Sequence, residues 1–292
     1  MMKNSFVLIL FLTLIISLIP SAVTAGAFDD VSLNARPAGM AEAYTAMRGG
    51  LDCAVYNPAG HADIDIAECV MSYRDFYGLG LINQKFAGFL FPDYRVNIGL
   101  SWHRVGTTGR VQFLEHDEDI YMLTVAGHPW MIDRLAAGVN FKFYRVFAES
   151  NASGYGFDAG LQYHLMDNTL GFGISGKNIG DIKIYWDTGA EDTLRSNYSF
   201  GTYFVPVKRA TISLDYMTTG VTNFGMEVNL VERLLVLRGG ISSSDERGII
   251  PASGFSLNYG TLEFDYAFSR HKDLGMTHVF SLVVKIKRGV FR

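Results

Sequence analysis

The sequence predicts an all-β fold, an antiparallel transmembrane barrel of about fourteen strands. Apolar and polar residues alternate with period two from about residue 67 to residue 287, which indicates strands. The alternating segments are roughly 9 to 13 residues long. That length suits tilted membrane strands of about 9 to 11 residues better than soluble strands of about 5 to 6. Short and long connections also take turns along the chain, as they do in outer-membrane barrels.

The first residues have the layout of a secretory signal peptide. Lys3 precedes an apolar run over residues 6–19, and Pro20 and small residues lead to Ala25. The run is short for a membrane helix, which needs about 20 apolar residues. We therefore expect a signal peptide at residues 1–25, with cleavage after Ala25 or Ala27, and an exported chain.

The composition after the signal peptide suits one β domain. The whole chain is 49% hydrophobic and 13% aromatic and has 31 glycines, yet no second stretch of 18 apolar residues follows the signal, which argues against helical membrane spans. About 265 residues remain, and no linker-like segment divides them. Basic residues are scattered and the formal charge is only -4, so no nucleic acid partner is expected.

The alternation is clearest where the two faces separate completely. Val96, Ile98, Leu100 and Trp102 form one face, and the residues between them are small or polar. A soluble sandwich also alternates, so strand length and connection pattern must decide between the two folds. Short connections are expected at residues 92–93, 129–133, 166–168, 206–208, 231–233 and 260, and longer ones at 106–118, 148–153, 179–194, 244–252 and 270–276. Connections near Gly80 and Gly220 would be short exceptions at the long-loop end.

The polar set of the barrel strands is predicted to face the lumen. It contains Asn140, Lys142, Asp158, His164, Lys177, Asp215, Glu227, Arg238, Glu263, Asp265 and Lys285. Both charge signs are present, whereas an ion-selective pore more often has one dominant sign. We therefore favour salt bridges across the interior, or to a segment inside it, over a role in ion selectivity.

Two stretches resemble a known family. Residues 26–66 do not alternate, and within them Asn57-Pro58 suits either a helix N-cap followed by the first helical residue or a type I turn. The run from residue 35 to Asn57-Pro58-Ala59-Gly60 resembles the N-terminal signature of the PorV/PorQ family of outer-membrane proteins, which are relatives of the FadL long-chain fatty acid transporters. Residues 156–163, followed by 171–173 and 177–180, are similar to a mid-barrel hairpin of that family.

The resemblance implies a fourteen-stranded barrel, over residues 67–292, whose N-terminal segment 26–66 folds inside as a hatch. Asn57, Pro58, Ala59 and Gly60 would belong to that hatch. Three features depart from the pattern. His61 replaces an apolar residue, the chain is shorter than FadL, and Phe291 is followed by Arg292. The length favours the PorV/PorQ branch over a FadL-type fatty acid pocket.

Motifs that suggest catalysis have structural explanations in this sequence. The glycines at 171, 173 and 176 satisfy a dinucleotide fingerprint, but a strand runs through them and no helical pattern follows to bind phosphate. They are expected to leave room for the hatch. No histidine pair has metal-ligand spacing, and Ser101 and His103 share a face without a third catalytic partner. We expect no enzyme activity, cofactor or metal.

Cys53 and Cys69 could pair in an oxidising compartment, although the strand pattern turns Cys69 toward lipid and makes a bridge harder. The leading functional hypothesis is hatch-gated passage of small hydrophobic molecules through an outer-membrane barrel of a double-membraned bacterium. The alternative is a PorV-like role in docking or anchoring exported proteins for type IX secretion. Expected partners are outer-membrane lipids, the barrel assembly machinery, and either a small hydrophobic ligand or secretion-system proteins.

Overall fold

A computed structural model describes residues 33–286, apart from 94, 109–114, 130, 131, 133, 166 and 246. The expected signal peptide and the last six residues lie outside this range. So do residues 26–32 of the expected hatch. Within the described residues, no helix is both long and apolar enough to cross a bilayer.

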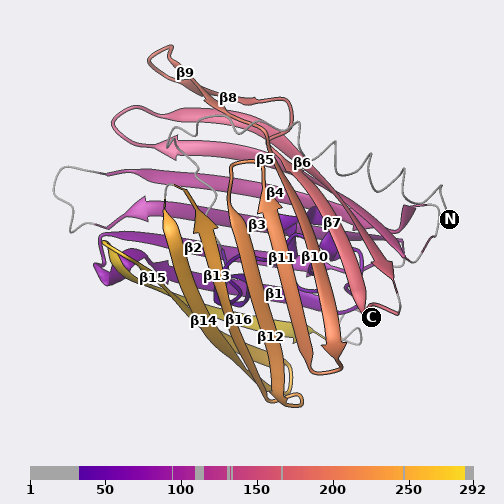
Figure 1. The fold of residues 1–292 in the computed structure, drawn as a ribbon. Helices are drawn as coiled ribbons and strands as arrows, with labels where there is room; N and C mark the ends of the chain where they lie inside the picture. Colours follow the sequence, from indigo (N-terminus) through magenta and orange to yellow (C-terminus); the bar gives the residue numbers. More distant parts are fainter. Residues whose placement is uncertain are drawn as a thin grey trace.

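The described residues form sixteen antiparallel strands in one sheet (Figure 1). The first seven strands are β1 (Ala67–Asp75), β2 (Ile82–Phe91), β3 (Val96–Thr107), β4 (Asp117–Gly127), β5 (Leu135–Phe147), β6 (Ala152–Leu165) and β7 (Leu170–Lys177). The connection that follows, residues 178–196, contains two short strands, β8 (Ile182–Trp186) and β9 (Glu191–Leu194). The last seven strands are β10 (Asn197–Val207), β11 (Ala210–Met217), β12 (Thr222–Val231), β13 (Leu235–Ser244), β14 (Gly248–Tyr259), β15 (Leu262–His271) and β16 (Gly275–Ile286).

The sheet closes on itself through two pairings. β1 pairs with β16 along its whole length, and β5 pairs with β6, so the ring runs in chain order from β1 to β7 and on from β10 to β16. Fourteen strands make the barrel, because β8 and β9 lie outside the ring. The sequence-based fold class is therefore confirmed. Closure leaves no strand of the ring with an open edge along its full length, as a sheet in lipid requires.

The β8–β9 hairpin is a feature that the sequence did not predict. Residues 179–194 were expected to form a loop, but β8 pairs with the start of β6, at Ala152 to Gly154, beyond the point where β7 ends at Lys177. The hairpin thus extends the wall past the rim of the barrel, as the projecting ribbon in Figure 1 shows. Its two strands are short, five and four residues, so they carry little periodic signal.

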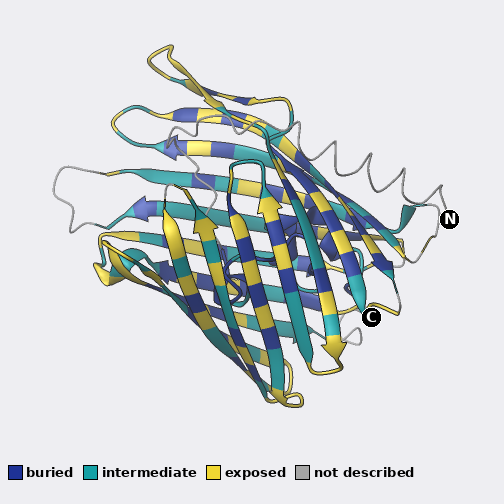
Figure 2. Ribbon diagram, viewed as in Figure 1, coloured by how far each residue is buried: buried dark blue, intermediate teal, exposed yellow. Residues whose placement is uncertain are grey.

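The two faces of the wall differ in burial. Along most strands buried and exposed residues alternate, which appears as banding in Figure 2. The face turned away from the interior, called the outer face here, carries large exposed apolar side chains such as Met71, Leu100 and Phe141. The inner face carries buried polar side chains such as Asn140 and Asp215. This is the inverse of a water-soluble domain and is the pattern of a lipid-facing barrel.

Both cysteines are free. Cys53 is buried inside the barrel, whereas Cys69 lies on β1 and shares the outer face with Met71 and Tyr73. The wall separates the two thiols.

Residues 33–66, called the plug here, lie inside the barrel and pack against its wall. They form two short helices, α2 (Ala35–Gly39) and α3 (Cys53–Tyr56), and a 3-10 helix, η1 (Pro58–His61). Most of the plug is buried, and its side chains form three apolar clusters with residues of the wall. Short helices suit this place because the chain must turn repeatedly within a narrow lumen.

Candidate functional site: the plugged lumen

Asn57 fastens the middle of the plug to the wall. Its side-chain oxygen accepts the N–H of Ala59 at 3.0 Å and so caps η1, with Pro58 at the first helical position. Its amide nitrogen donates to the carbonyl oxygens of Leu161 and Ile174, on the paired strands β6 and β7, at 3.1 and 3.3 Å. It also donates to Thr45 O at 2.9 Å. The N-cap is one of the two local structures that the sequence allowed for Asn57-Pro58.

Glycines on the inner face make this close approach possible. A Cβ atom added at Gly160 would overlap the Asn57 side-chain oxygen, and one at Gly138 would overlap the Pro58 carbonyl group. Gly173 meets Thr45 O in the same way. Of the glycines in the apparent dinucleotide motif, Gly173 makes room for the plug, Gly171 faces the ring of Tyr203, and Gly176 lies near Ile179 and Tyr198.

Side chains of the wall satisfy the main chain of the plug. Asp215 accepts the N–H groups of Tyr44 and Thr45 at 2.7 and 2.6 Å. Gln162 donates to Thr45 O and Met47 O at 3.1 and 2.9 Å. Further along, Asn140 donates to Ala54 O at 2.8 Å, and Asn97 donates to His61 O at 2.6 Å and Ile64 O at 2.7 Å. Irregular backbone away from water needs such partners, and the wall provides them.

A chain of buried ion pairs joins the plug to three strands. Arg36 of the plug binds both oxygens of Glu227 on β12, at 3.0 and 3.2 Å. Arg238 on β13 donates to the same carboxylate at 2.6 Å and to Asp265 on β15 at 3.1 Å. Asp265 also accepts the Ser256 hydroxyl. The charges alternate in sign along the chain, so each one has an opposite neighbour.

The remaining residues of the predicted lumen set belong to separate groups. Lys142 pairs with Asp158 at 2.6 Å and donates to Asn178 at 2.7 Å, near the end of β7. The Lys177 ammonium lies 5.6 Å from the centroid of the Tyr56 ring of the plug. Lys285 pairs with Glu263 at 2.7 Å, and this pair is not among the plug contacts described above. All these side chains lie on the inner face, but they form no single site.

Asp63 is the centre of a cluster that the sequence did not reveal. Its carboxylate lies 3.4 Å from Arg48 of the plug, 3.4 Å from His128 after β4, and 3.4 Å from His164 on β6. His164 in turn contacts the Tyr203 hydroxyl at 3.2 Å. Asp63, Arg48 and Arg36 lie in the stretch without periodicity, so no pattern assigned them a direction. Only their partners on distant strands identify them.

One side of the plug is apolar. Met40, Tyr44, Met47, Cys53 and Tyr56, with Ala46, form a buried cluster that reaches Tyr203 of the wall. The Tyr44 and Tyr56 rings lie 5.3 Å apart. Methionine and aromatic side chains therefore lie between this part of the plug and Tyr203 of the wall.

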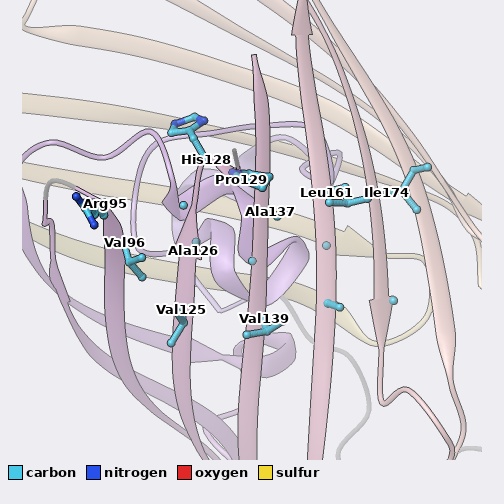
Figure 3. Close-up of a pocket in the computed structure, with 15 residues that line it drawn as sticks. Arg95, Val96, Val125, Ala126, His128, Pro129, Ala137, Val139, Leu161 and Ile174 are labelled. Atoms are coloured by element: carbon cyan, nitrogen blue, oxygen red, sulfur yellow. The ribbon is translucent and has the colours of Figure 1, made fainter. Parts of the chain in front are cut away.

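A groove of about 650 Å³ lies in the outer face of the wall, across β3 to β7 (Figure 3). Small residues, Ala137, Ala159 and Gly176, line it, and Leu161 and Ile174 border it. Gly138 and Gly160 also line it, and the Asn57-Pro58 turn lies directly behind these two glycines. The wall is therefore one backbone thick between this groove and the plug.

Comparison with known proteins identifies the fold. No protein-family model matches the sequence, and a search of curated proteins finds no significant match. Among solved structures, the chain is similar to the Ralstonia pickettii toluene transporter TbuX, with a TM-score of 0.66 and 12% identity over 89% of this chain and 100% of that one. It is also similar to a Pseudomonas aeruginosa FadL homologue (TM-score 0.65, 13% identity, 88% of this chain and 98% of that one).

The P. putida toluene transporter TodX gives a TM-score of 0.65 at 10% identity, over 89% of this chain and 100% of that one. The chain thus has the fold of FadL-type barrels. No comparison assigns it to the PorV/PorQ branch in particular.

Replacing Glu227 by Gln tests the ion-pair chain. The substitution leaves Arg36 and Arg238 facing each other without the carboxylate between them, so we expect the free energy of unfolding to fall by about 3 to 5 kcal/mol. Glu232→Gln is the matched control, because Glu232 forms only an exposed pair with Arg209 at 3.9 Å, which is worth about 0 to 1 kcal/mol. Denaturant unfolding in detergent micelles measures both. Equal losses for the two variants would contradict the assignment.

Replacing Gly160 by Ala tests how the plug is seated. The new methyl group would overlap the Asn57 side chain, so we expect the plug to shift and its segment to be cleaved faster by added protease. Gly239→Ala is the control, because a Cβ there meets nothing within 4 Å and its backbone needs no glycine. If both variants are cleaved at the wild-type rate, Gly160 does not seat the plug.

Proposed function

We propose that this protein is an outer-membrane channel for small hydrophobic molecules and that movement of the plug opens it. The observation that carries the proposal is the plug itself, which lies inside a closed barrel and is hydrogen-bonded to its wall. Proteins with this fold include chains described as toluene transporters and as a monoaromatic hydrocarbon channel. The apolar outer face of the ring and its short turns at one end support the location.

The lumen supports a hydrophobic cargo more than an ionic one. Its charged side chains are paired with opposite charges or hydrogen-bonded to the plug, so they form no ring of one sign. The apolar cluster that includes Met40, Tyr44 and Tyr56 lies on the surface that plug movement would uncover. A passage opened there would have apolar walls on the plug side and hydrogen-bonding groups on the barrel side.

Docking of exported proteins is the second candidate function, and the β8–β9 hairpin favours it. The hairpin extends beyond the rim, and Tyr185 on it is 56% exposed. Among the described residues, β9 pairs only with β8 and so offers an edge for strand addition. Under this function, deletion of residues 182–194 would abolish retention of an exported protein and leave uptake of hydrophobic compounds unchanged.

A reversible lock on the plug tests the channel proposal. The Ala35 N–H donates to the Ser281 hydroxyl at 2.8 Å, so cysteines at these positions are close enough to bond after small adjustment. Residue 66 already precedes β1, and a bond at residue 35 would therefore fix both ends of the plug. With Cys53 and Cys69 replaced by Ala, we expect the oxidised A35C/S281C protein to lose uptake of labelled toluene and to regain it with reductant.

The single variant S281C in the same background is the matched control and should transport equally with and without reductant. Uptake by the oxidised double variant at the rate of the reduced one would show that toluene does not need the plug to move. Toluene uptake that is equal in cells with and without the gene would overturn the channel proposal.

A further inference from the structure

A second groove, of about 670 Å³, lies in the outer face nearer the long-loop end. Its lining comes from β1 to β6, strands that are neighbours in the ring. Four aromatic residues are register neighbours on the adjacent strands β3 to β6, and all four lie on the outer face. They are Trp102, Tyr121, Phe143 and Tyr155, called the aromatic row here, and Ala87 on β2 is the register neighbour of Trp102. Rows of tryptophan and tyrosine mark the level where hydrocarbon meets the headgroups in membrane barrels. The groove therefore begins at the membrane interface and continues into the hydrocarbon.

A charged row lies two residues further toward the long-loop end of each strand. Register pairs Lys85 with Arg104, Arg104 with Asp119, and Asp119 with Arg145. Asp117 lies beyond Asp119 on the same face of β4 and contacts Arg104. These residues are on the outer face, because they share the parity of the exposed Tyr73, Tyr121 and Phe141. Charge on this face at this level belongs among lipid headgroups.

Asp119 fixes the charged row to the aromatic row. It is fully buried, and it accepts the Trp102 indole N–H at 2.8 Å and two Arg104 nitrogens at 2.8 and 2.6 Å. Asp117 takes a third Arg104 nitrogen at 3.0 Å. The Arg104 charge is thus opposed by two carboxylates of the wall. Such a network holds the mouth of the groove in one shape.

Lys85 and Arg145 supply the cations that face outward on either side of this network. Both residues are exposed, and the Arg145 guanidinium lies over the Phe147 ring, 4.1 Å from its centroid. Asp117, which is about one third exposed, offers an acceptor between them. The mouth of the groove therefore presents two cationic donors for an anion and one carboxylate acceptor for a hydroxyl group.

We propose that this groove binds a phosphorylated, acylated glycolipid of the surrounding leaflet. An acyl chain lies in the groove beneath the aromatic row, and a sugar hydroxyl donates to Asp117. One phosphate contacts Lys85 and a second contacts Arg145, because these residues lie three strand spacings, about 14 Å, apart. Charge complementarity at the mouth selects an anionic headgroup, and the separation of the two cations favours a sugar headgroup with two phosphates over a lipid with a single phosphodiester. The inference rests on the proposed membrane location but does not depend on what passes through the lumen.

Native mass spectrometry of the full barrel in detergent, titrated with purified lipid A, tests the proposal. Wild-type protein should bind the lipid, and K85Q/R145Q should bind it roughly thirtyfold more weakly, because each cation near a phosphate strengthens binding about fivefold. Ala87→Phe, which fills the groove and leaves the charges unchanged, should also weaken binding. Lys272→Gln is the matched control, as an exposed cation in the loop between β15 and β16, and should bind like the wild type.

Equal binding by wild type and K85Q/R145Q would overturn the site. Phosphatidylglycerol binding as tightly as lipid A would overturn its preference for a glycolipid. A folded barrel, recognised by gel mobility that shifts on boiling, that binds no lipid A would overturn this inference and leave the channel proposal standing. Recovery of the mature chain in solution without detergent would instead overturn the proposed membrane location.

Discussion

The structure depends on one constraint. The plug has little regular backbone hydrogen bonding of its own, and it lies inside a wall whose strands already use their backbone groups to pair with one another. Thirty-four residues of the plug turn repeatedly through the lumen, and their carbonyl and N–H groups need partners. Asp215, Gln162, Asn140 and Asn97 provide these partners from four different strands. The polar inner face thus serves mainly to receive a folded segment.

The plug must also lie close to the wall. Polar side chains of the wall reach the plug backbone only at hydrogen-bond distance, and at that distance the inner face needs glycines where the plug touches it. Gly138, Gly160 and Gly173 are such positions, and they lie opposite Pro58, Asn57 and Thr45. The many glycines therefore have a specific explanation in this part of the wall, because they shape the seat of the plug.

The sequence was informative where the structure is periodic and uninformative elsewhere. Period two predicted the strands, their inward and outward faces, and the count of fourteen, because the lipid and the lumen impose opposite polarity on alternate residues. The β8–β9 hairpin was missed because it projects past the rim, where this contrast is lost. The partners of Arg36 and Asp63 were missed because those residues meet strands far away in sequence. The pairing of Asn57 with Leu161 and Ile174 likewise depends on tertiary structure alone.

Ion conductance across a planar bilayer tests the central claim most directly, because a barrel of this size conducts steadily unless something fills it. We expect the reconstituted full-length protein to show no steady conductance, and a form lacking residues 33–62, verified as a folded barrel, to show a stable open-pore current. A steady current from the full-length protein would contradict the claim that residues 33–66 close the lumen.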